Sequence, residues 1–226
     1  MSRSSMAFLV LVLVVPLLTA AGGKSAKIDY SNVPGLDDAG VKIPGLLVEL
    51  KYSTTDNFLK RDVYGDLEKC YLQKDALRML AKATADLKRM RPDLTLLTYD
   101  CARPSSVQRQ MWEIVKGTPQ QSYVANPNTK TGSIHNYGCA VDLTLATRDG
   151  KSLDLGTPFD FFGKLAQPRH EMSMLRSGKL TAEQFANRLL LREVMIRAGF
   201  LPIASEWWHF NCAPNYVARK KYKKIP

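Results

Sequence analysis

Two short polar segments contain two of the three histidines of the chain. In the first, His135 precedes Asp142 by seven residues, and Asp142 stands in an apolar run; in the second, Glu206 precedes His209 by three residues. A carboxylate in an apolar strand is costly unless a cation offsets its charge. Catalytic zinc sites combine three nitrogen or oxygen ligands with a position open to water. The spacing therefore predicts zinc held by His135, Asp142 and His209, with Glu206 taking a proton from water.

Each of these residues has an ordinary alternative when it is taken alone. His135 would be a surface histidine in a loop, and Asp142 would be paired with a basic side chain. The joint occurrence of both motifs favours the metal site. The third histidine, His170, matches neither motif, and we expect it to be a surface or loop residue.

The elements that must position these residues follow from hydrophobic periodicity and from helix-start and helix-stop residues. The pattern predicts helices over residues 74–91, 104–117 and 182–198, and strands over residues 94–99, 140–146 and 207–211. Residues 22–45 are expected to be an irregular lead-in, residues 118–134 a long loop, and residues 156–178 show no clear pattern. Helices and strands interleave without tight βαβ spacing, which predicts a single α+β domain with a mainly antiparallel sheet flanked by helices.

The N-terminus has the features of a secretory signal peptide. Arg3 is followed by an uncharged run over residues 7–18 and by the small residues Thr19-Ala20-Ala21. As a helix that run is only about 18 Å long, too short for a bilayer core of roughly 30 Å. We therefore expect a signal peptide at residues 1–21, a folded domain over residues 22–226, no stable membrane anchor after cleavage, and export to the periplasm or cell envelope.

The net charge of +11 makes nucleic acid the first partner to test. Five basic residues are concentrated in residues 219–224, in a tail over residues 219–226 that we expect to be solvated and to contact anionic envelope surfaces. No zinc finger, RNA-binding aromatic pattern or long basic helix accompanies the charge, which argues against nucleic acid.

Four cysteines, Cys70, Cys101, Cys139 and Cys212, form no C-x-x-C pair, so a thiolate zinc site is not indicated. An even number in an exported chain permits two disulfides in three connectivities. Buried free thiols are the alternative, and the sequence leaves the redox state open.

The two histidine motifs read S-x-H-x-x-G-x-A-x-D and E-x-W-H, and both resemble those of the zinc D-alanyl-D-alanine dipeptidases, a branch of the DD-peptidases of family M15 with a hedgehog-type fold. Residues 51–58, residues 99–104 (D-x-x-R-P) and residues 156–160 (G-T-x-F-D) resemble further family segments. These segments occur in family order across most of the chain.

The resemblance implies that His135, Asp142 and His209 bind one zinc ion and that Glu206 is the general base and then the general acid. Arg103 would stabilise the oxyanion, although a strand–helix turn also suits a surface arginine. The pocket would be shaped by Tyr52, Ser133 and Asp160. Asp160 would pair with the substrate ammonium group and Ser133 with a polar end of the dipeptide, although Asp160 could instead cap a following helix.

The function implied is hydrolysis of the dipeptide D-alanyl-D-alanine in cell-wall peptide turnover. One alternative is an exported zinc D,D- or L,D-carboxypeptidase that trims peptidoglycan stems, which needs a cleft open at the amino end of the substrate. The G-T-x-F-D match favours the dipeptidase. Another alternative is a non-catalytic wall-binding module, against which Glu206 and Arg103 argue, since a binder needs neither.

Overall fold

The computed structural model describes residues 28–30, 32–129 and 131–226. The signal peptide expected at residues 1–21 lies outside the described residues. Within the described ranges, no helix is long and apolar enough to cross a bilayer.

The central element is a five-stranded sheet in the order β2-β4-β5-β7-β6. Its strands in that order are Leu47–Val48, Leu94–Asp100, Ala140–Thr147, His209–Asn211 and Leu201–Pro202. Only the β2–β4 pair is parallel; the other neighbours are antiparallel. A small second sheet pairs β1 (Leu36–Asp38) with β3 (Tyr71–Gln73). The predicted α+β domain with a mainly antiparallel sheet is thus confirmed.

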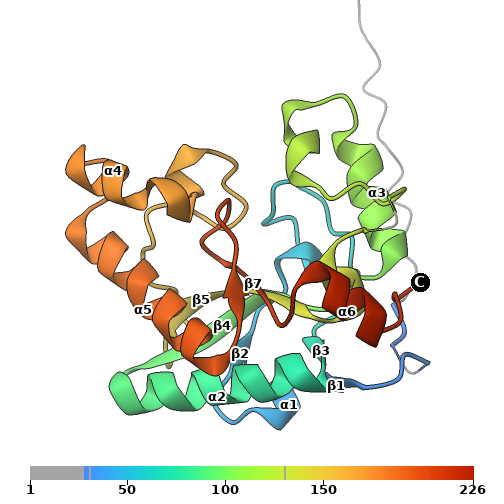
Figure 1. Cartoon of the computed structure of the whole chain (residues 1–226), viewed down its shortest axis with the longest axis horizontal. Helices are drawn as coiled ribbons and strands as arrows, with labels where there is room; N and C mark the ends of the chain where they lie inside the picture. Colours follow the sequence, from blue (N-terminus) through green and yellow to red (C-terminus); the bar gives the residue numbers. More distant parts are fainter. Residues whose placement is uncertain (1–27, 31, 130) are drawn as a thin grey trace, which may run out of the picture.

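The helices of the described residues are α1 (Ala39–Lys42), α2 (Lys74–Met90), α3 (Ser105–Val115), α4 (Glu171–Arg176), α5 (Ala182–Ala198) and α6 (Asn215–Lys221). Figure 1 shows α2 along the bottom of the view and α5 running down the left side to meet it, with α4 at the upper left and α3 at the upper right. The buried face of α2 carries Leu80, Ala83 and Leu87, each fully buried at helical spacing. The Thr181–Gln184 capping box starts α5 as predicted.

Several expected segments differ from the structure. The lead-in over residues 22–45 is not irregular throughout, because it contains β1 and α1. The strand expected over residues 207–211 begins only at His209. The long loop contains the 3₁₀ turn η2 (Pro119–Tyr123), and the basic end forms α6. Beyond α6, Ile225 is buried and anchors the end of the chain on the domain, whereas Lys220, Lys221 and Lys223 are exposed to solvent as expected.

The four cysteines form two disulfides, Cys70–Cys101 and Cys139–Cys212, with Cα–Cα distances of 5.3 and 5.1 Å. The first joins the segment before β3 to the end of β4. The second joins the start of β5 to the end of β7. This selects one of the three connectivities that the sequence left open, and no cysteine is free.

Candidate active site

The neighbouring strands β5 and β7 place two of the predicted metal ligands, Asp142 and His209, side by side. Asp142 of β5 is the register partner of His209 of β7, and on its other side Asp142 pairs with Asp100 of β4. Side chains directly opposite each other on antiparallel strands have Cβ atoms about 4.5–5.5 Å apart. A row of three polar side chains therefore crosses three neighbouring strands.

His135 reaches the same row from the 3₁₀ turn η3 (Ile134–Tyr137), which precedes β5. The turn begins with a capping box between Ser133 and Asn136 and ends at Gly138, whose φ is 63°. A Cβ at Gly138 would lie 2.6 Å from Cδ2 of Leu36, so only glycine fits this turn. The turn thus fixes where the His135 ring enters the cavity.

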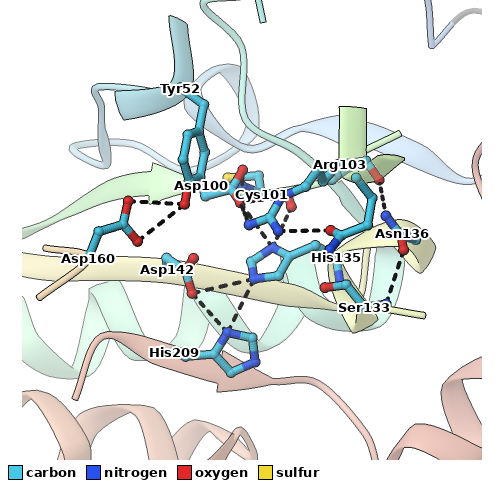
Figure 2. Close-up of polar contacts among 12 residues, drawn as sticks. Tyr52, Asp100, Cys101, Arg103, Ser133, His135, Asn136, Asp142, Asp160 and His209 are labelled. Carbon is cyan, nitrogen blue, oxygen red and sulfur yellow. Dashed lines mark hydrogen bonds and ion pairs between the residues drawn. The ribbon is translucent and has the colours of Figure 1, made fainter. Parts of the chain in front are cut away.

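The outer nitrogens of both imidazoles are bonded to oxygen acceptors, and Figure 2 shows the contact of His135. His135 Nδ1 donates to the Cys101 carbonyl at 2.7 Å. His209 Nε2 donates to Oδ1 of Asn211, which Figure 2 does not label, at 2.9 Å. In a neutral ring the other nitrogen then carries a lone pair. His135 Nε2 and His209 Nδ1 are those nitrogens, and both face Asp142 Oδ1, at 3.4 and 2.9 Å.

The three facing atoms fit a metal ion. The two imidazole nitrogens are 3.2 Å apart, and all three ligand atoms lie within 4.8 Å of one another. Two ligands on a tetrahedral zinc with bonds of about 2.0–2.1 Å are roughly 3.3 Å apart. Outer-nitrogen partners of the kind seen here orient metal-binding imidazoles. The donor set and spacing thus suit zinc.

The electrostatics of this centre favour a positive charge. Burial lowers the pKa of His209, but the hydrogen bond and charge of Asp142 outweigh burial and raise it to about 9. Burial raises the pKa of Asp142, whereas His135 and His209 hold it well below its ordinary value. Glu206 Oε2 lies 4.0 Å from His209 Nδ1, and burial raises the pKa of this carboxyl. A proton or a metal cation is therefore strongly attracted here.

Arg103 extends into the cavity from the turn between β4 and α3 and is only 8% exposed, unlike a surface arginine. Its Nε and Nη2 donate to Oδ2 of Asp100, and its Nη1 donates to Gln108 Oε1 at 3.0 Å. Asp100 also accepts a 2.5 Å bond from the Tyr64 hydroxyl. Burial lowers the pKa of Arg103, but the Asp100 charge raises it well above its usual value, so the guanidinium stays charged.

The remaining predicted residues complete a cavity of about 270 Å³. The Tyr52 hydroxyl donates to both oxygens of Asp160, at 3.2 and 3.0 Å (Figure 2). Burial and the charge of Asp142 raise the pKa of Asp160 well above its ordinary value. The next helical turn, η4 (Lys164–Ala166), has Gly163 as its N-cap, so Asp160 does not cap it.

A family model described as D-Ala-D-Ala dipeptidase, of peptidase family M15, matches residues 34–225. The chain belongs to this family. It is therefore an enzyme, a metallopeptidase. The D-alanyl-D-alanine dipeptidase of Escherichia coli (strain K12) is 36% identical to it over 80% of this chain and 86% of the relative. Those of Synechocystis sp. and Enterococcus faecium are 29% and 27% identical, over 62% and 74% of this chain and 68% and 86% of the relatives.

In this member of the dipeptidase family, all eight residues singled out in the sequence line one cavity. They are Tyr52, Arg103, Ser133, His135, Asp142, Asp160, Glu206 and His209. His170 lies elsewhere, at the end of η5 (Pro168–His170) and partly exposed, as expected.

Sequence reasoning missed the residues that support these side chains. Asp100 lies within the D-x-x-R-P segment and Gln108 in the first turn of α3, and both hold Arg103 rather than facing the metal ligands. Asn211 stands two residues after His209 in β7, a spacing that places both on one face of the strand. That spacing is the signal that could have found it. Nothing in the sequence indicates that the carbonyl of Cys101 orients His135.

Proposed function

We propose that this enzyme hydrolyses D-alanyl-D-alanine to two molecules of D-alanine with the help of one bound zinc ion. The observation that carries the proposal is a single small cavity that brings the cation-attracting centre of Asp142 together with Glu206, Arg103 and Asp160. The relatives named D-alanyl-D-alanine dipeptidase in Escherichia coli and Enterococcus faecium align with most of the chain. At about 270 Å³ the cavity is at the small end of ligand sites, which suits a dipeptide.

His135, Asp142 and His209 would hold the zinc ion. Zinc in such a site supplies a Lewis acid that polarises a carbonyl group and lowers the pKa of water to about 7. Glu206, beside His209 Nδ1 at 4.0 Å, accepts the proton of the attacking water and returns it to the leaving amine. The raised pKa of Glu206 suits this double role, because the carboxyl can both take and release a proton.

Arg103 stabilises the negative charge that develops on the carbonyl oxygen. Its bonds to Asp100 and Gln108 hold the guanidinium in place before substrate arrives. A fixed donor directed at developing charge requires no reorganisation during the reaction, and removing one typically costs about 2.7–4 kcal/mol.

Two polar groups bind the ends of the dipeptide. Asp160 pairs with the ammonium group, whose charge favours the ionised carboxylate that burial disfavours. The Ser133 oxygen accepts from the His135 backbone at 3.3 Å, so its hydroxyl proton remains available for the substrate carboxylate. Left unpaired, these groups would penalise substrates that lack either charge.

Export and a role in cell-wall peptide turnover are part of the proposal. An enzyme outside the cytoplasm meets peptides released from the wall, and two disulfides suit an oxidising compartment. The basic side chains of residues 219–224 favour weak contact with an anionic envelope.

The decisive experiment is the substitution Glu206→Gln. We expect zinc content to stay at about one ion per chain while release of D-alanine from D-alanyl-D-alanine falls by about 10²–10⁴-fold, the usual contribution of a general acid–base. Glu193→Gln is the matched control, because Glu193 is paired with Arg197 on the surface of α5. Activity of Glu206→Gln at the wild-type level would refute the mechanism.

The wild-type enzyme also separates the dipeptidase from a carboxypeptidase. It should hydrolyse D-alanyl-D-alanine much faster than N-acetyl-D-alanyl-D-alanine, because the blocked compound brings no ammonium group to Asp160. Turnover of the blocked compound alone would support the carboxypeptidase, and a zinc-binding protein inactive on both would support the binding module.

A further inference from the structure

Three aromatic rings close one side of the cavity, next to Asp160. We call Phe58, Tyr123 and Phe162 the aromatic clasp. The Tyr123 and Phe162 rings are stacked, with centroids 4.3 Å apart and planes inclined by 14°. Phe58 meets Phe162 edge to face at 4.7 Å. All three rings line the same cavity as Asp160.

The clasp connects parts of the chain that are far apart in sequence. Phe58 follows η1 (Lys51–Ser53), Tyr123 ends η2, and Phe162 stands two residues after Asp160 in the segment that leads to α4. In Figure 1, the α3–η2 region and the region around α4 rise on opposite sides above the sheet. The stacked pair is therefore a contact between the two sides, made directly at the cavity.

The clasp also contacts Tyr52, the residue whose hydroxyl is bonded to Asp160. The Tyr52 ring contacts the Phe58 ring at 6.3 Å, and the Tyr52 hydroxyl donates to both Asp160 oxygens. A substrate ammonium group on Asp160 would thus lie beside an aromatic wall. Any group attached to that nitrogen would need the space that the clasp fills, and its amide would face rings that offer few hydrogen-bond partners.

We propose that the aromatic clasp is the specificity determinant that restricts this enzyme to substrates with an unsubstituted amino end. The proposal rests on the proposed function, because it takes Asp160 as the site of the substrate ammonium group. Asp160 selects for the positive charge, whereas Phe58, Tyr123 and Phe162 exclude the additional bulk. The two effects are separable, because removing a ring leaves the carboxylate in place.

The test compares kcat/KM for Gly-D-Ala-D-Ala and N-acetyl-D-Ala-D-Ala with kcat/KM for D-Ala-D-Ala in the zinc-loaded full chain. Both longer substrates lack the ammonium group at Asp160, in the wild type and in the variants alike. A change in the ratio between wild type and variant therefore measures only the exclusion of bulk by the aromatic clasp. We expect Phe162→Ala and Tyr123→Ala each to raise the ratio at least about tenfold, the scale on which an apolar pocket discriminates.

Phe161→Ala is the matched control. Phe161 precedes Phe162 in the same segment, is 41% exposed and does not line the cavity, so its removal should leave the ratio within about twofold. If Phe162→Ala or Tyr123→Ala does not fold, Phe162→Val and Tyr123→Val, which still remove the ring and much of its volume, take their place.

An unchanged ratio in folded clasp variants would overturn the proposal. An equal rise of the ratio in Phe161→Ala would overturn it as well. These outcomes differ from failure of the proposed function, which would appear as a wild-type enzyme that does not hydrolyse D-Ala-D-Ala at all. A wild type that is active on the dipeptide with a low ratio, together with variants of raised ratio, supports both.

Discussion

Arg103 is held in the cavity by an anion that the protein itself provides. Asp100 is fully buried and receives two guanidinium bonds, the Tyr64 hydroxyl and the Cys101 backbone amide. The guanidinium group has five N–H donors. Bonds to Asp100 and Gln108 use three of them, so Nη1 and Nη2 each keep one N–H for a substrate oxygen. The pairing thus orients the arginine without saturating it.

Asp100→Asn tests this arrangement. The substitution keeps the shape but leaves a buried guanidinium without its counter-charge, and breaking a buried pair in this way costs roughly 3–5 kcal/mol of unfolding free energy. We expect kcat/KM for the dipeptide to fall in parallel, with zinc content unchanged. Urea unfolding, steady-state kinetics and metal analysis measure the three quantities.

Asp93→Asn is the control for that substitution. Asp93 pairs with Arg91, but the two side chains are 57% and 46% exposed, and exposed pairs contribute less than about 1 kcal/mol. Equal losses of stability in the two variants would contradict the account of Asp100.

At the scale of elements, the turn η3 converts a loop residue into a positioned ligand. The His135 backbone carbonyl accepts the Arg103 amide at 2.9 Å, and the Asn136 side chain donates to the Arg103 carbonyl at 2.8 Å. The turn and the β4–α3 connection are therefore locked together. A shift of either segment moves both a metal ligand and the oxyanion donor.

Gly138→Ala should expose this coupling. The alanine must adopt a φ of 63° and its Cβ would meet Leu36 at 2.6 Å, so the turn has to move. Gly117→Ala is the matched control, because Gly117 has a φ of 76° with no atom within 4 Å of the added Cβ. The left-handed conformation alone costs about 1–2 kcal/mol in either variant. We expect Gly138→Ala to lose more stability than Gly117→Ala and to bind zinc more weakly, measured by chelator competition. Unaltered zinc affinity would show that His135 does not depend on the turn.

At the scale of the whole molecule, the sequence predicted features that form within one helix, but it did not predict contacts between segments that are far apart in the chain. The capping box at Thr181 and the stop at Gly199 act within one helix, so they could be recognised from the chain alone. The pairing of β1 with β3 involves only three residues on each side, too few for periodicity to detect. The cysteine connectivity depends on which strands are neighbours, and local spacing carries no information about that. His135, Asp142, Glu206 and His209 could be recognised because their chemistry is unusual for their surroundings, and Tyr52, Arg103, Ser133 and Asp160 only through the family resemblance. Asp100, Gln108 and Asn211 act through other side chains.

The segment after α6 ties distant parts of this molecule together. Ile225 donates its amide to the Asn136 carbonyl at 2.8 Å, and its carbonyl accepts the Ser105 hydroxyl at 2.6 Å. These contacts lie next to His135 and Arg103 in the chain. Further back, Lys221 and the Tyr222 hydroxyl donate to Asp75 in the first turn of α2. Residues 221–225 therefore link α2 to the turn η3 and to the β4–α3 connection, which carry His135 and Arg103.

Asp75→Asn gives a pH-dependent test of that link. Hydrogen bonds from Lys221 and then Tyr222 lower the pKa of Asp75 in the folded protein. A lowered folded pKa stabilises the fold fully above the unfolded pKa of about 3.9, and this stabilisation is lost as the pH falls through the folded value. The free energy of unfolding of the wild type should exceed that of Asp75→Asn by up to about 1 kcal/mol at pH 7, since the pair is partly exposed. Near pH 2 the two values should be almost equal. Urea unfolding at pH 7, 5, 3 and 2 measures the gap, and Tyr222→Phe should reduce it. A gap of the same size at every pH would mean that Asp75 stabilises the fold by its shape and neutral contacts rather than by its charge.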